Sequence, residues 1–141
     1  CAYFTANAEA KGGLEIGTID TTIREKVANY EKRIWVENSE QGVPVYVRAR
    51  GFSGDDSADL SYTPGTGWVD GEDGWWYYTD LLNASESTTE LVADISRIFP
   101  ENAEVGENFN VVVVYEAVLP ISGLEGALGT FQAYIEGGGN Q

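Results

Sequence analysis

The chain has 141 residues, of which 43% are hydrophobic and 12% aromatic, with only four prolines. This size and composition predict one folded domain, and they exclude a disordered chain or two independent cores. The formal net charge is -15, and residues 51–141 hold one arginine against sixteen acids, whereas residues 1–50 are balanced. Such a field repels phosphates and anionic headgroups, so nucleic-acid binding and electrostatic membrane binding are disfavoured.

The chain begins at Cys1 and contains no methionine. We interpret this as a mature protein whose leader has been removed, and we expect it outside the cell or at the cell surface. No apolar run approaches the roughly 20 residues that span a bilayer, so we expect no transmembrane segment. Cys1 is the only cysteine, and three interpretations stay open: an ordinary residue at a cleavage site, a disulfide between two chains, or a lipid anchor.

Residues 1–10 alternate strictly between apolar and polar side chains, which predicts a β-strand. Its apolar face is made of small residues and one aromatic ring: Ala2, Phe4, Ala6 and Ala8. Such a strand can join its own sheet, or it can enter another molecule and complete that molecule's sheet. Gly12 and Gly13 follow at once and supply a flexible hinge. We therefore divide the chain into a donor strand with its hinge, residues 1–12, and a folded domain, residues 13–141.

Further segments rich in β-branched and aromatic residues predict strands at 33–37, 43–50, 75–79, 88–92 and 109–118. In residues 43–50 the alternation predicts a strand buried on one face, with Tyr46, Arg48 and Arg50 on its other face. Glycine-rich and acidic breaks separate these strands, and the longest covers residues 51–67. We expect helix only as single turns within 57–60, 91–99 and 123–128. The pattern predicts an all-β fold, a jelly roll or β-sandwich with a protruding N-terminal donor strand.

The chain contains no histidine. It therefore lacks a Ser-His-Asp triad, a Cys-His pair and the HExxH zinc motif, and we expect no enzyme, no catalytic residue and no cofactor. Loop carboxylates are the remaining candidates for acid–base chemistry, and residues 70–74 also offer oxygen ligands for calcium. Their spacing is not specific, and we expect solvated acids and no metal site at these positions: Asp55, Asp56, Asp59, Asp70, Glu72 and Asp73.

Two surface motifs complete the candidates. Trp68 together with the aromatic run at residues 75–78 can form a platform for stacking sugar rings, although alternation favours core packing and contacts with a neighbouring subunit. Asn83, followed by Ala84 and Ser85, matches the acceptor pattern for N-glycosylation.

Six short motifs then occur in a familiar order: CAYFT at residues 1–5, IGTID at 16–20, VEN at 36–38, VYVR at 45–48, WYY at 76–78 and FNVVVVYEAV at 109–118. In this order they resemble the TasA/camelysin family over most of the chain. The resemblance implies a secreted jelly-roll subunit of biofilm fibres or pili, joined by donor-strand complementation through the N-terminus. A protease activity ascribed to camelysins is not carried over, because the usual histidine ligands are missing.

These observations predict a structural, pilin-like subunit of an extracellular filament with a role in biofilm or surface adhesion. Its partners would be further copies of the same chain. The alternative is a monomeric cell-surface module that binds carbohydrate through the Trp/Tyr cluster.

Overall fold

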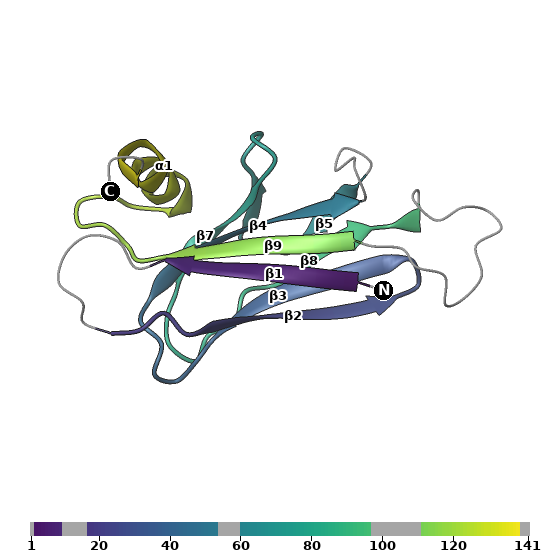
Figure 1. Cartoon of the computed structure of the whole chain (residues 1–141), viewed down its shortest axis with the longest axis horizontal. Helices are drawn as coiled ribbons and strands as arrows, with labels where there is room; N and C mark the ends of the chain where they lie inside the picture. The colour runs from purple at the N-terminus through teal and green to yellow at the C-terminus, as the bar shows by residue number, and fades with distance from the viewer. Residues whose placement is uncertain (1, 10–16, 54–59, 97–110, 139–141) are drawn as a thin grey trace.

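The computed structural model describes the backbone of residues 2–9, 17–53, 60–96 and 111–138 (Figure 1). These residues form nine strands and one helix: β1 (Ala2–Glu9), β2 (Thr21–Ala28), β3 (Glu31–Asn38), β4 (Val45–Ser53), β5 (Ser61–Pro64), β6 (Trp68–Asp70), β7 (Trp76–Leu82), β8 (Leu91–Asp94), β9 (Val111–Val118) and α1 (Ala127–Gly138). The predicted all-β class is confirmed at this level.

The strands form two sheets. The first sheet has the order β1-β9-β4-β7-β6, and the second has the order β2-β3-β8-β5. Neighbouring strands run antiparallel in every pair except β1 and β9, which run parallel. In Figure 1 β1 lies between β9 and the second sheet, and it begins at the end of the molecule opposite α1.

The main core lies between the two sheets and follows the two-residue period of the strands. Val45, Val47 and Ala49 of β4 are fully buried there and face Ile34 and Val36 of β3. Tyr115 Oη and Thr21 Oγ1, 2.9 Å apart, form a hydrogen bond that joins β9 of the first sheet to β2 of the second.

At one end of the first sheet α1 covers the outer face of β4 and β7 (Figure 1), which corrects the prediction that residues 43–50 form a strand buried on one face only. Tyr46 and Arg48, on the supposedly exposed face of β4, are 9% and 8% exposed. Tyr46 lies in a second apolar cluster with Tyr77 of β7 and with Ala127 and Phe131 of α1. No covering layer was predicted for this face, because helix α1 was not predicted.

The helix predictions are tested only in part, because residues 57–59 and 97–99 lie outside the described part of the chain. The turn expected within 123–128 is replaced by a loop and the start of a helix of 12 residues, while residues 91–94 form β8 between β3 and β5. Gly126, with φ of 86°, ends the preceding loop, and its carbonyl accepts the hydroxyl of Thr130 at 2.8 Å. The expected break at 51–67 also contains β5, whereas residues 54–59 lie outside the described part of the chain.

Candidate functional site

The parallel seam between β1 and β9 is the feature of the fold that bears most directly on the predicted donor strand. The two strands pair over eight positions, from Ala2 opposite Val111 to Glu9 opposite Val118. On its other side β9 pairs with β4, also over eight positions. Strand β9 is therefore held in place by β4, and β1 covers its remaining edge.

The side chains of β9 divide cleanly between two faces. Val113, Tyr115 and Ala117 are buried in the main core, whereas Val112 and Val114 on the other face are half-buried. Glu116, also on this outer face, accepts a hydrogen bond from Arg48 Nε at 2.7 Å. The edge of β9 therefore has an apolar row on its inner face. On its outer face the single charge, Glu116, is paired with Arg48.

Strand β1 differs from the other strands that form sheet edges in the described chain. Strand β2 carries three consecutive charges, Arg24 to Lys26, while β5 has four residues and ends at Pro64. Strand β6 has only three residues. Short length, charges and proline all oppose the addition of another strand. Strand β1 has eight residues, no proline and a single charge at its last position, Glu9.

The structure brings the predicted donor residues to the seam by register. Ala2, Phe4, Ala6 and Ala8 pair with Val111, Val113, Tyr115 and Ala117, in that order. Only the backbone of β1 is described, so the inward orientation predicted for these four side chains stays a prediction. Cys1, Gly12 and Gly13 lie outside the described residues.

The aromatic residues predicted as a sugar platform are not gathered on one surface. Trp68 and Tyr78 pack edge to face in the main core with ring centroids 5.3 Å apart. Tyr77 points to the opposite face of the sheet and packs on Phe131 of α1 at 5.7 Å. Trp75 and Trp76 are half-buried.

A buried arginine beneath α1 was missed by the sequence analysis. The guanidinium of Arg48 lies 3.9 Å from the ring centroid of Trp75 and 4.9 Å from that of Phe131, and it is paired with Glu116. Stacking on rings and pairing with a carboxylate compensate its burial. The spacing of Ala127, Phe131 and Tyr134, typical of one helix face, was the available signal for the covering element.

The acidic loop at residues 70–74 uses its oxygens locally. Asp70 Oδ1 accepts the backbone N–H of Glu72 at 2.8 Å, and Asp73 Oδ1 accepts that of Trp75 at 2.9 Å. Asp73 Oδ2 accepts the hydroxyl of Tyr77 at 2.6 Å. Within the ranges that the structure describes, no three Cys, Asp or Glu side chains gather as metal ligands. Asp55, Asp56 and Asp59 lie outside these ranges.

The glycosylation candidate lies in an exposed turn directly after β7. Asn83 is exposed, and its backbone N–H donates to Glu86 Oε1 at 2.8 Å. Its side-chain amide donates to the same oxygen at 3.3 Å. The turn is tied to the preceding β3–β4 loop by a hydrogen bond from Ser85 N to Ser39 O.

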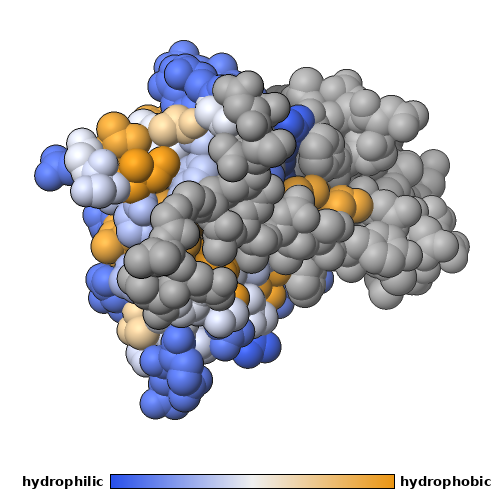
Figure 2. Space-filling view, turned by 60° about the vertical axis from the view of Figure 1, so that its left-hand side comes forward, coloured by the Kyte–Doolittle hydropathy of each residue, from blue (hydrophilic) through white to orange (hydrophobic). Residues whose placement is uncertain are grey.

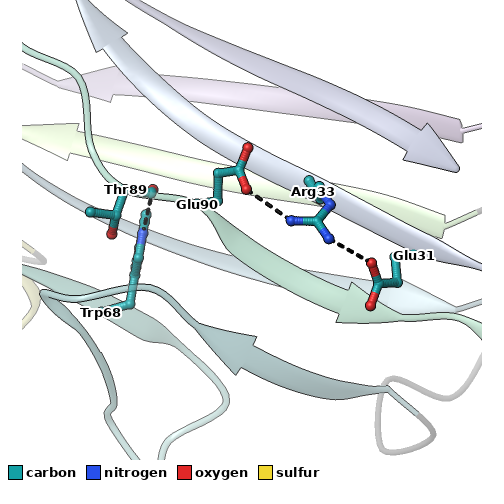
Figure 3. A network of polar contacts seen from close by, with 5 residues as sticks. All are labelled: Glu31, Arg33, Trp68, Thr89 and Glu90. Atoms are coloured by element: carbon teal, nitrogen blue, oxygen red, sulfur yellow. Dashed lines mark hydrogen bonds and ion pairs between the residues drawn. The ribbon is translucent and has the colours of Figure 1, made fainter.

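The outer face of the second sheet is exposed and carries a row of charges (Figure 3). Arg33 donates to Glu31 on one side and to Glu90 on the other, at 2.9 and 3.0 Å. All three side chains are more than 40% exposed, so each pair contributes no more than about 1 kcal/mol. Behind this row Trp68 Nε1 donates to Thr89 O at 2.8 Å and ties the two sheets together.

The described helix is too short to cross a membrane. Comparison of the chain with protein-family models, with curated proteins and with solved structures finds no match.

Proposed function

We propose that this protein is a structural subunit of an extracellular homopolymer, in which the β1 strand of one copy pairs with β9 of the next copy. In the isolated chain β1 occupies the edge of its own sheet; in the filament the same position is filled by a neighbour. The observation that carries this function is the β1–β9 seam, in which the edge strand lacking the usual protective features covers an eight-residue edge of the sheet. The resemblance to TasA/camelysin proteins points in the same direction.

Once a strand has been exchanged, the junction between subunits needs no covalent bond to hold. An exchanged strand makes the pairing that it makes within its own chain, so the free-energy difference between the two states comes mainly from the connection between β1 and β2. Each main-chain hydrogen bond contributes about 0.5–1.5 kcal/mol, and the eight-residue seam adds several such bonds. Once formed between copies, this seam holds the subunits together.

The register assigns the donor residues to two rows. We propose that Ala2, Phe4, Ala6 and Ala8 form the inner row, because they pair with positions of β9 whose described side chains are buried. A shift by one residue would place the polar row there instead. The remainder of the molecule then forms the jelly-roll body of the subunit.

Substitutions in neighbouring positions of β1 test this function. Ala6 pairs with buried Tyr115, and Thr5 pairs with half-buried Val114. Ala6→Glu should abolish polymerisation measured by light scattering and negative-stain microscopy, because it places an unpaired charge against the core. Thr5→Glu is the matched control and should polymerise.

Deletion of residues 1–10 should leave no filaments, and normal fibres from this truncation would refute the function.

Exchange between copies is distinguished from pairing within one chain by cross-linking two different variants. Thr5 and Val114 are opposite one another in the register, within reach of a disulfide. We would mix Thr5→Cys chains with Val114→Cys chains, both carrying Cys1→Ser, and oxidise them during assembly. Exchange predicts a disulfide-linked dimer of the two variants. A mixture that forms fibres without this dimer would exclude the β1–β9 seam as the junction.

A further inference from the structure

The sandwich opens into a cleft on the side opposite the β1–β9 seam. This cleft has a volume of about 430 Å³ and is lined by residues of β4, β5, β6 and β7 and by Leu60 and Gly74 from the adjoining loops: Gly51, Leu60, Ser61, Tyr62, Asp70, Gly74 and Trp76. We call it the β5–β6 cleft, since β5 and β6 are the edge strands of the two sheets on this side. Its volume lies within the range of small-molecule sites.

Two aromatic rings form the apolar part of the β5–β6 cleft. Tyr62 and Trp76 are half-buried, with ring centroids 5.5 Å apart and planes inclined by 50°. The hydroxyl of Tyr62 is fixed by the backbone N–H of Gly51 at 3.0 Å. A side chain at position 51 would meet this hydroxyl, since an added Cβ would lie 2.8 Å from it. The glycine therefore lets the tyrosine ring lie close against β4.

Polar groups stand beside these rings. Ser61 and Asp70 are exposed at the cleft. The carboxylate of Asp70 accepts the backbone N–H of Glu72 through Oδ1. A carboxylate offers about four acceptor positions, so Asp70 has capacity for hydroxyl donors of a ligand. Aromatic faces beside hydroxyl and carboxylate groups suit a ring that is apolar on its faces and rich in hydroxyls at its edge.

Charge selects among such rings. The net charge of -15 opposes anionic ligands. A cationic ligand would meet Arg50, whose guanidinium carbon lies 3.7 Å from the position of a Cβ on Gly74 at the rim. A neutral ring is the remaining class.

A second cleft of nearly equal volume, about 450 Å³, lacks this combination. Its aromatic residue, Tyr78, is buried in the main core, and two acids, Asp80 and Glu86, line it together with Ser87. The chain therefore contains its own control site, similar in size and in hydroxyl groups but without half-buried rings.

We propose that the β5–β6 cleft binds a neutral saccharide unit, stacked on Tyr62 and Trp76 and hydrogen-bonded by Ser61 and Asp70. This goes beyond self-assembly and does not depend on it. A filament built from such subunits presents one saccharide site per subunit along its length.

The test uses the full chain as a monomer, isotope-labelled, with the indole N–H signal of Trp76 assigned through Trp76→Leu. The probes are cellotriose, maltotriose, mannotriose and chitotriose, with trigalacturonate as the anionic probe. At least one neutral probe should shift the Trp76 signal in a saturable manner. Ser61→Ala should weaken this binding about three- to ten-fold, the equivalent of one hydrogen bond. Ser87→Ala, in the second cleft, should leave it unchanged, and thermal unfolding should show that both variants fold.

Three outcomes would overturn the assignment. The first is the absence of a saturable Trp76 shift with every neutral probe. The second is equal weakening by Ser61→Ala and Ser87→Ala, which would move binding to another site. The third is tighter binding of trigalacturonate than of any neutral probe. None of these outcomes bears on filament formation, which the β1 variants test separately.

Discussion

Arg48 shows how a single residue fastens the helix to the sheet. Its guanidinium stacks on Trp75, approaches Phe131 and pairs with Glu116, so one charged group on β4 contacts β9, the loop before β7 and α1. A lysine cannot reproduce this geometry, because it lacks the planar fork that stacks and pairs at once.

We predict that Arg48→Lys lowers the free energy of unfolding by about 2–4 kcal/mol, since it leaves a nearly buried pair incomplete. The measurement is urea denaturation. Arg24→Lys is the control, because Arg24 forms an ion pair with Glu37 in which both side chains are well exposed, and it should change stability by less than about 1 kcal/mol. Equal effects of the two substitutions would contradict the role given to Arg48.

Asp73 gives the same region a pH dependence. Burial alone would raise the pKa of Asp73. Hydrogen bonds from the Tyr77 hydroxyl and the Trp75 backbone lower it by more, so the net pKa lies below the ordinary value of 3.8. A carboxylate whose pKa is lowered in the folded state stabilises the protein above the unfolded pKa, and this contribution is lost as pH falls through the folded pKa. Asp73→Asn should therefore remove part of the loss of stability in acid. Denaturation of both proteins from neutral pH down to about pH 2.5 measures this, and parallel curves would refute it.

At the scale of elements, three strands of the main core could be predicted. Residues 43–50 alternate between apolar and polar side chains, and the segments of β3 and β9 are rich in β-branched and aromatic residues. The structure places β3, β4 and β9 in these three segments. The short edge strands β5 and β6 were not predicted. Pro64, Gly65 and Gly67 are typical loop residues, and the conformation of β5 and β6 depends on pairing with β8 and β7.

Helix α1 could not be predicted from propensity. It contains Gly129 and Gly137 as well as the β-branched residues Thr130 and Ile135, so its formation depends on tertiary packing. Phe131 is buried against Tyr77, while Tyr134 Oη donates to Leu119 O at 3.0 Å. Tyr77 and Leu119 lie outside the helix, so helix propensity within residues 127–138 does not report these contacts.

Only part of the β1–β9 seam could be predicted from the sequence. Alternation identifies the strand of residues 1–10 and its apolar row. Length alone leaves two segments as partners for it, residues 14–23 and residues 111–118, and the structure pairs β1 with the second. The parallel direction could not be predicted, since it depends on where β4 places β9 in the sheet.

Removal of Phe131 should detach the helix. Phe131→Ala should cost about 3 kcal/mol or more, because it empties the centre of the apolar cluster beneath α1. Ile135→Ala is the matched control on the same helix; Ile135 is 58% exposed, and its loss should cost less than about 0.5 kcal/mol. Thermal and chemical denaturation provide the comparison, and a small effect of Phe131→Ala would show that α1 does not stabilise the sheet.

The surface of the whole molecule favours separation of subunits. In Figure 2 hydrophobic side chains form small groups among hydrophilic ones on the face that is visible. Leu124 before α1 and Leu128 and Ile135 within it are exposed, but α1 also carries the exposed polar side chains of Gln132 and Glu136. With a net charge of -15 on each chain, approaching copies repel one another.

Assembly should therefore accelerate with salt. Raising ionic strength from about 0.01 to 0.15 M shortens the Debye length from about 30 to 8 Å, which screens repulsion between subunits without removing the main-chain hydrogen bonds of the seam. Light scattering at several concentrations of sodium chloride measures the rate. A rate that falls with salt would show that attraction between charges, and not strand exchange, drives assembly.

The β1–β9 seam pairs two different strands, and this determines what the two ends of an assembly look like. A head-to-tail junction between copies has no two-fold axis, so every subunit in the proposed filament points the same way. One end then carries a β9 edge without a partner strand, and the other carries an unused β1. The filament has polarity, and a free peptide of residues 1–10 would cap one end while leaving the other able to grow.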